Sequence, residues 1–205
     1  MNTQTPILRK GRKVEQVLAG AREVFLRDGF EGASVDEIAK VSGVSKATLY
    51  SYFSDKRRLF QEVVQAECDR MSQEIQASID PDAPLEVALR TAANGMVRFL
   101  VSKFAQRVFR ICLAERDRFP ELGQSYFDSG PKRGHEELCQ YFKEAADCGA
   151  LVIEDFDMAA DQFAELCKSG LFVRAAFGVQ SEFSDAEIER VAEEAAKTFI
   201  ARYGA

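Results

Sequence analysis

Apolar side chains recur every three or four residues along almost the whole chain, and apolar–polar alternation never lasts long enough to indicate a β-strand. Such spacing gathers the apolar residues on one face of a helix. The pattern therefore predicts an all-α protein. The first is expected from about residue 10 to residue 28 and to end at Gly29, with an apolar stripe of Val14, Val17, Leu18, Ala21, Val24 and Phe25.

Capping residues mark where the next helices begin. Ser34 and Glu37 have the spacing of a capping box, in which each side chain satisfies a free backbone amide at the start of a short second helix. Ser45 is expected to cap a third helix that reaches about Tyr52, and Ser54 a long fourth helix. The first quarter of the chain is therefore predicted to hold the first helix, two short helices and the start of a long fourth one.

Prolines and glycines divide the rest of the chain. We expect breaks at 80–84, 119–120 and 130–131, because proline removes a backbone donor and clashes with the preceding turn. Two long helices, 156–177 and 184–203, are expected to close the chain, the second opened by another capping box. Small residues on their apolar sides would let helix axes approach closely; these are Ala160, Ala164, Cys167, Gly170, Ala192, Ala195 and Ala196.

The segment from 34 to 53, SVDEIAKVSGVSKATLYSYF, has the spacing of a helix-turn-helix. Ala39 is small where the two helices would cross, and Gly43 can adopt the positive φ that a tight turn needs. The second helix of such a motif lies in the major groove of DNA. Lys46, Ala47 and Thr48 would then contact base edges.

Hydroxyl and ammonium groups beside this segment are candidates for contacts with phosphate. Tyr50, Ser51 and Tyr52 offer hydroxyls, Lys56 begins the fourth helix, and Ser34 begins the second. Tyr50 and Tyr52 could instead be core aromatics, as we expect of Phe53. Lys56 is expected to strengthen binding to every sequence alike, whereas Lys46 is expected to set sequence preference.

The distribution of charge supports contact with DNA at one end only. The chain carries a formal net charge of −6, yet residues 1–60 hold 11 Lys and Arg against 7 Asp and Glu. Four of the five residues from Arg9 to Lys13 are cationic. A basic N-terminal region in an otherwise acidic protein indicates that this region contacts phosphate and that the rest of the protein does not.

The run from Val14 to Phe60, centred on DGFEGASVDEIAKVSGVSKATLYSYFSDKRRLF, resembles the DNA-binding domain of the TetR/AcrR family of bacterial transcriptional regulators. The later segment AERDRFPELGQSYFDSGP is loosely similar to the C-terminal domain of the AefR-like branch. The resemblance implies about nine helices, a homodimer formed through the last two of them, a palindromic double-stranded operator, and release by a small, often lipophilic effector. It also implies DNA contacts at Ser34, Lys46, Ala47, Thr48, Tyr50, Ser51, Tyr52 and Lys56. Ala47 stands where many relatives have glycine, so the base preference stays open.

Two parts follow from this interpretation: residues 1–56 as the DNA-binding domain, and residues 57–205 as a helical regulatory and dimerisation domain. An effector pocket is expected among the fourth to eighth helices. Its wall would include Met71, Met96, Phe99, Phe127 and Phe163, each of which could equally be ordinary core.

Other chemistry has weaker support in the sequence. Five dispersed cysteines without a Cys-x-x-Cys pair, together with a single histidine, His135, predict no metal site and no disulfide framework. The chain has no nucleophile-elbow or phosphate-loop motif, so we expect neither an enzyme nor a cofactor. A thiol-based redox regulator and a helical protein-interaction module that does not bind DNA remain the alternatives. Without a secretory signal or a long apolar run, the expected compartment is the cytoplasm and no membrane contact is expected.

Overall fold

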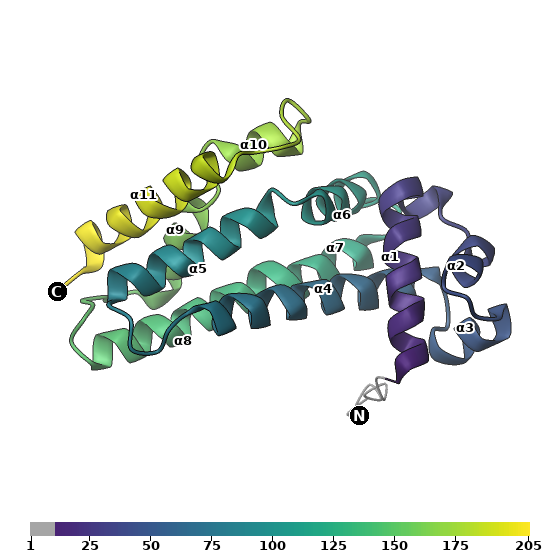
Figure 1. The fold of residues 1–205 in the computed structure, drawn as a ribbon, viewed down its shortest axis with the longest axis horizontal. Coiled ribbons are helices and arrows are strands. Elements are labelled where there is room, and N and C mark those ends of the chain that lie inside the picture. Colours follow the sequence, from purple (N-terminus) through teal and green to yellow (C-terminus); the bar gives the residue numbers. More distant parts are fainter. Residues whose placement is uncertain (1–10) are drawn as a thin grey trace.

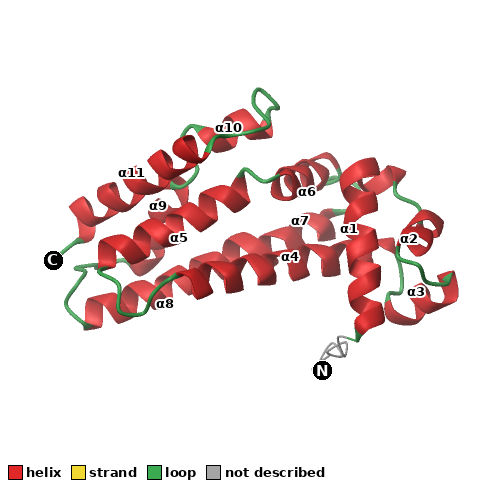
Figure 2. Ribbon diagram, viewed as in Figure 1, coloured by secondary structure: helices red, strands yellow, loops and turns green. Residues whose placement is uncertain are grey.

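The computed structural model describes residues 11–205, so Arg9 and Lys10, and with them the predicted start of the first helix, lie outside the described residues. Within that range the chain is helical and forms no strand (Figure 2). Leu151 and Gly204 pair in an isolated antiparallel bridge. The helices are α1 (Arg12–Gly32), α2 (Val35–Val41), α3 (Lys46–Tyr52), α4 (Lys56–Ser78), α5 (Leu85–Leu100), α6 (Lys103–Ala114), α7 (Pro120–Phe127), α8 (Arg133–Asp147), α9 (Phe156–Leu166), α10 (Leu171–Ala176) and α11 (Asp185–Tyr203). The predicted all-α fold is confirmed.

The molecule is elongated, with α1, α2 and α3 forming a head at one end (Figure 1). Helix α1 crosses the first turns of α4, and α4 runs from this head along the body. Helices α5 and α11 pack side by side above it, and the chain ends far from the head. The head is thus held away from most of the body, with α4 as the long connection.

Helix α1 is interrupted where the sequence predicts its end. Gly29 has φ 76° and ψ −174°, which is outside helical geometry and is open to glycine alone among the common residues. The chain then resumes one more helical turn before Ala33. The predicted boundary is therefore a kink within α1.

Two predicted caps differ in detail. Asp55, and not Ser54, caps α4, because its Oδ1 accepts the Arg58 N–H at 2.9 Å. At α2 only half of the predicted capping box forms: the Glu37 N–H donates to Ser34 Oγ at 3.1 Å, whereas the Glu37 carboxylate lies near cationic side chains of α1 and α2. The capping box at the start of α11 is complete: Ser184 Oγ accepts the Glu187 N–H, and the Glu187 carboxylate accepts the Ser184 N–H.

The chain does not break at Gly130-Pro131. Residues 128–132 form a π-helical turn that joins α7 directly to α8. A π turn is wider than an α turn, and here it contains Pro131 without ending the helical path. Ser129 is buried in this turn and donates to Gln65 Oε1 at 2.9 Å, which holds the turn against α4.

The predicted helix 156–177 is divided in two. Gly170 has φ 71°, a left-handed conformation, and it separates α9 from the short α10. The small residues predicted to permit close approach of helices do so inside the chain: Ala160, Ala192, Ala195 and Ala196 are buried. They belong to a core that also contains side chains of α5.

Two clusters of buried apolar residues hold the protein together. The first combines the head with the first half of α4 and with α6 and α7. The second combines α5, α8, α9 and α11, and its centre is formed by Phe142, Phe163 and Phe199, whose ring centroids lie 4.6–5.8 Å apart. Within residues 11–205, no helix has both the length and the apolar character that crossing a bilayer requires.

Candidate nucleic-acid interface and ligand cavity

The turn between α2 and α3 has the conformation that its sequence predicts. Gly43 has φ 64°, and it is followed by Ser45, whose Oγ accepts the Thr48 N–H at 3.0 Å and so caps α3. Ile38 and Leu49, one from each helix, are buried in the first core. These contacts fix the angle between the two short helices.

A second glycine, which the sequence analysis did not single out, sets the distance between α1 and α2. A Cβ at Gly20 would lie 2.2 Å from Ser42 Oγ and 2.9 Å from the Ser42 backbone nitrogen. Only a residue without a side chain allows this approach. A glycine within a strongly periodic helix was the available signal, but its partner lies 22 positions away and is not visible in local spacing.

The outward face of α3 presents four of the predicted DNA-contacting residues. Lys46, Ala47, Tyr50 and Ser51 are all exposed. The Ser51 hydroxyl donates to Thr48 O at 2.7 Å, so it must exchange that bond to donate to phosphate. The major groove of DNA is wide enough to admit an α-helix that presents such side chains.

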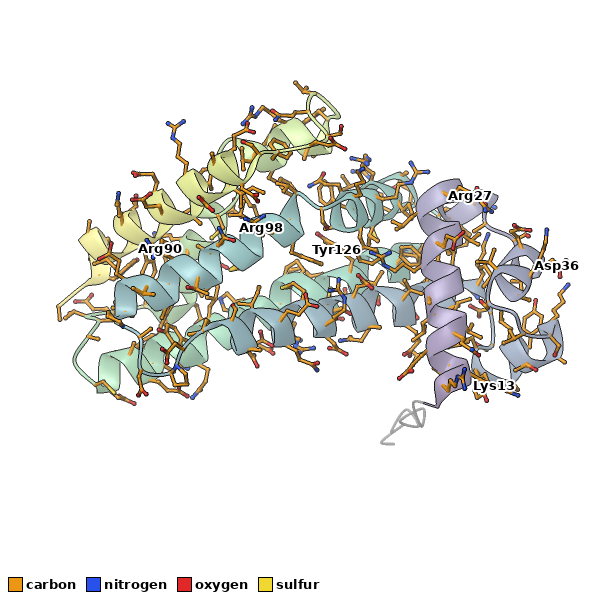
Figure 3. All side chains as sticks on the ribbon, in the orientation of Figure 1. Lys13, Arg27, Asp36, Arg90, Arg98 and Tyr126 are labelled. Atoms are coloured by element: carbon orange, nitrogen blue, oxygen red, sulfur yellow. The ribbon has the colours of Figure 1, made fainter. Side chains whose placement is uncertain are left out.

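Lys46 has an acidic partner in the free protein. Its Nζ lies 2.6 Å from Oδ1 of Asp36 on α2, and both side chains are more than half exposed. The hydrogen bond to Asp36 is the main cause of the raised pKa of Lys46. Asp36 lies at the outer end of the head in Figure 3, so its carboxylate is on the surface that would approach DNA.

The remaining predicted DNA-contacting residues are partly buried or already hydrogen-bonded within the protein. Thr48 is half-buried and its hydroxyl lies 2.8 Å from Ser45 Oγ. Tyr52 is half-buried against the first core, with its ring centroid 6.4 Å from that of Phe53, which is fully buried as predicted. Ser34 is exposed, but its Oγ already accepts an amide of α2.

Lys56 fastens the head to the start of α4. Its ammonium donates to the carbonyl oxygens of Glu31 and Ala33 at 3.3 and 3.1 Å, and lies 4.7 Å from the centroid of the Phe30 ring. These contacts hold the loop between α1 and α2. An ammonium group has three N–H donors, so one remains for a phosphate.

A cavity of about 1040 Å³ lies between α4 and α5 and is bordered by α1, α6 and α11. Met71 and Phe99, two of the predicted effector contacts, line it together with Ile75 and Asn94. Gly95 permits α5 to approach α4 here, since a Cβ would lie 2.5 Å from Ile75 Cγ1. The charged residues of the wall are Arg22, Glu67, Arg70, Glu74, Arg90, Arg98, Lys103, Glu189 and Glu193. Arg90 and Arg98 are labelled on α5 in Figure 3.

The other three predicted pocket residues do not line this cavity. Phe163 is fully buried in the second core, Met96 packs against that core, and Phe127 is 53% exposed at the end of α7. Helical periodicity identified all of them as apolar positions. It did not identify which neighbouring helix each position faces.

Arg22 connects the cavity to the head. It belongs to α1, its Nε lies 3.1 Å from Glu67 Oε1 on α4, and its guanidinium carbon lies 5.1 Å from the centroid of the Phe104 ring on α6. All three residues border the cavity. A molecule bound there would therefore touch a residue on the same helix that carries the Gly20 contact to α2.

The cysteines do not resemble a redox-sensing pair. Burial raises the pKa of Cys68 to about 11 and the pKa values of Cys112 and Cys167 to about 12. Such thiols are protonated at neutral pH, and the thiolate is the reactive form. Cys148 is exposed, and Cys139 is buried beside His135.

A three-helix head with an outward-facing second motif helix, carried on a larger helical body, is the architecture of helix-turn-helix transcriptional regulators. The chain belongs to the TetR family: residues 17–63 match the model of bacterial regulatory proteins of the tetR family. Residues 87–205, more than half of the chain, match the C-terminal domain of AefR-like transcriptional repressors.

Individual relatives agree with this assignment. The transcriptional activator FasR of Mycolicibacterium smegmatis is 34% identical over 85 residues, which are 42% of this chain and 39% of FasR. The chain aligns with about two fifths of the length of the curated relatives that it first matches. A TetR-family regulator from Mesorhizobium loti has a TM-score of 0.87 and 28% identity, covering 96% of this chain and 99% of its own. The flavonoid-responsive regulator FrrA has a TM-score of 0.74 and 33% identity, covering 95% and 98%.

Proposed function

We propose that this protein is a homodimeric transcriptional repressor, which binds a palindromic operator through α3 and leaves it when a small molecule binds. The observation that carries the proposal is the exposed face of α3, with Lys46, Ala47, Tyr50 and Ser51. Residues 1–56 would read the DNA, and residues 57–205 would dimerise and bind the effector. Its activity would lie in the cytoplasm, where bacterial operators are found.

The DNA-binding proposal is tested with fragments selected from the genomic DNA of the source organism. Fluorescence anisotropy should give tighter binding to a selected fragment than to its scrambled version, and the affinity should fall steeply as salt rises. Lys46→Ala should weaken binding to the selected fragment by roughly 5- to 100-fold, while changing the affinity for the scrambled duplex little. Lys132→Ala, on the π-helical turn, is the matched control. Equal binding to selected and scrambled duplexes at low salt would refute the proposal.

Dimerisation is proposed through α9 and α11. A groove of about 600 Å³ runs between these helices and is lined by Met158, Leu166 and Tyr203. Met158 is half exposed, and a groove with exposed apolar side chains and a polar rim is the kind of surface that a partner covers. Met158→Asp should shift the sedimentation of the protein from dimer to monomer, whereas Val87→Asp on α5 should not. If the wild-type protein is a monomer at micromolar concentration, the dimer proposal is refuted.

The cavity between α4 and α5 is the proposed effector site. Met71, Ile75 and Phe99 offer apolar contacts, and the arginines and Asn94 offer hydrogen bonds. This mixture suits a hydroxylated aromatic compound better than a purely aliphatic one. The name of FrrA, which is 33% identical, supports the same class, so flavonoids are the first compounds to test.

Calorimetry with a flavonoid panel and with fatty acids as comparison compounds tests the effector proposal. Phe99→Ala should lower the affinity for a bound flavonoid, whereas Phe127→Ala, outside the cavity, should not. The same ligand must weaken operator binding, and operator DNA must weaken ligand binding by the same factor. A ligand that binds the Phe99→Ala and wild-type proteins equally would exclude this cavity.

A further inference from the structure

The only histidine of the chain lies in a cluster of potential metal ligands at the contact between α8 and α9. His135 and Cys139 are one turn apart on α8, and Asp157 and Asp161 are one turn apart on α9. Residues four positions apart share one face of a helix. Each helix therefore directs two side chains toward the other.

Three of these residues, His135, Cys139 and Asp157, have ligand atoms near one another, and Asp161 lies beside His135. His135 Nε2 lies 3.7 Å from Oδ1 of Asp157, 3.7 Å from Oδ1 of Asp161 and 3.9 Å from Cys139 Sγ. Cys139 Sγ lies 3.7 Å from Asp157 Oδ1. Ligands around a zinc ion are separated by roughly 3.3–3.6 Å, given bond lengths of about 2.0–2.3 Å. Small rotations of the His135 ring and of the exposed aspartates would close the difference.

We propose that His135, Cys139, Asp157 and Asp161 bind a divalent transition-metal ion of the zinc type. One thiolate and one imidazole favour such a borderline-soft ion over magnesium or calcium, which prefer oxygen ligands. Binding forms one bond to Cys139 Sγ and releases the thiol proton to solvent. The carboxylates bind as they are, and His135 binds through Nε2 in the tautomer that keeps its proton on Nδ1.

The surroundings permit both entry and retention of an ion. Asp157 is exposed, so an ion can reach the cluster from solvent, whereas Asp161 also lines the groove of the proposed dimer interface and Cys139 is buried at the base of the cluster. The Cys139 thiol now donates to Phe156 O at 3.5 Å, and the backbone oxygen of Asp157 lies 3.2 Å from His135 Nε2. Both contacts would give way to bonds with the metal.

The prediction of no metal site relied on ligand pairs close in sequence. Here each pair has the spacing of a helical turn, and a loop of 148–155 separates the two helices. A bound ion would join α8 to α9 and thereby constrain a helix of the proposed dimer interface. The metal proposal stands independently of DNA binding, since its test measures metal alone.

The test uses the full chain without an affinity tag, stripped with chelator and kept reduced. Titration with Co(II) should give one equivalent per chain, with the charge-transfer band of a cobalt thiolate and the visible bands of tetrahedral cobalt. Zn(II) should displace the cobalt, and a hundredfold excess over its dissociation constant should raise the melting temperature by about 5–10 °C.

Single substitutions test which side chains bind the metal ion. His135→Gln and Asp161→Asn should each weaken Co(II) binding at least about tenfold, and Asp161 is exposed enough that its substitution should leave the fold intact. Cys148→Ser, which changes the exposed cysteine, should bind as the wild type does. Absence of the thiolate band, unchanged affinity in folded Asp161→Asn, or loss of the band in Cys148→Ser would each overturn the proposal.

Discussion

Lys56 allows a sharp test of whether a basic residue at the head holds the protein together or contacts DNA. Lys56→Met keeps the aliphatic length and removes the ammonium group. The variant loses two hydrogen bonds to the carbonyls of Glu31 and Ala33, and the cation above the Phe30 ring. For partly exposed groups these contacts together stabilise by about 1–3 kcal/mol. For a chain of this length, the melting temperature should fall by roughly 3–10 °C.

Thermal unfolding at fixed protein concentration measures the loss of stability. The salt dependence of operator affinity measures whether Lys56 contacts phosphate. A lysine that neutralises a phosphate contributes about 0.9 to the slope of log K against log salt. We expect Lys56→Met to change this slope by much less, because the ammonium is already bound to two carbonyls. Lys40→Met, whose side chain is 80% exposed on α2, is the control for stability. An unchanged melting temperature with a slope reduced by about 0.9 would refute the reasoning.

Three further predictions concern other contacts. Gly20→Ala should lower the free energy of unfolding in urea by about 1–3 kcal/mol, because the new Cβ overlaps Ser42; in an open helix the same change would stabilise. Asp36→Asn frees Lys46 and removes a negative charge, so affinity for any duplex should rise roughly two- to fivefold in low-salt anisotropy and converge with wild type in high salt. Burial raises the pKa of Cys112 from about 9 to about 12, so the folded state keeps a proton that the unfolded state loses, and stability falls as pH rises above 9. Cys112→Ala should reduce that fall by about 1.4 kcal/mol per pH unit in denaturation curves between pH 9 and 11; equal slopes would contradict the assignment.

Local chemistry carried the sequence predictions that succeeded. The cap at Ser45 and the turn at Gly43 depend on neighbours within three or four residues, and both are present in the structure. The cap of α4 was misplaced by one residue and the capping box at α2 is only half formed, whereas the other failures depend on distant packing. Pro131 stays within a helical path because the π turn packs on α4, and Gly20 matters because of a residue on another helix. Phe163 was recognisable as apolar, but only the assembled fold directs it into the second core and not into the cavity.

The first core affects how DNA-binding domains can be exchanged between related regulators. Phe60, just beyond the proposed boundary at residue 56, meets Phe25 and Phe30 of α1, and Phe119 at the start of α7 reaches the same Phe30 ring. A graft cut at residue 56 would pair a foreign α1 with aromatic rings shaped for this one. A working chimaera of this protein must therefore transplant the first turns of α4 and the facing surface of α6 and α7 along with the helix-turn-helix.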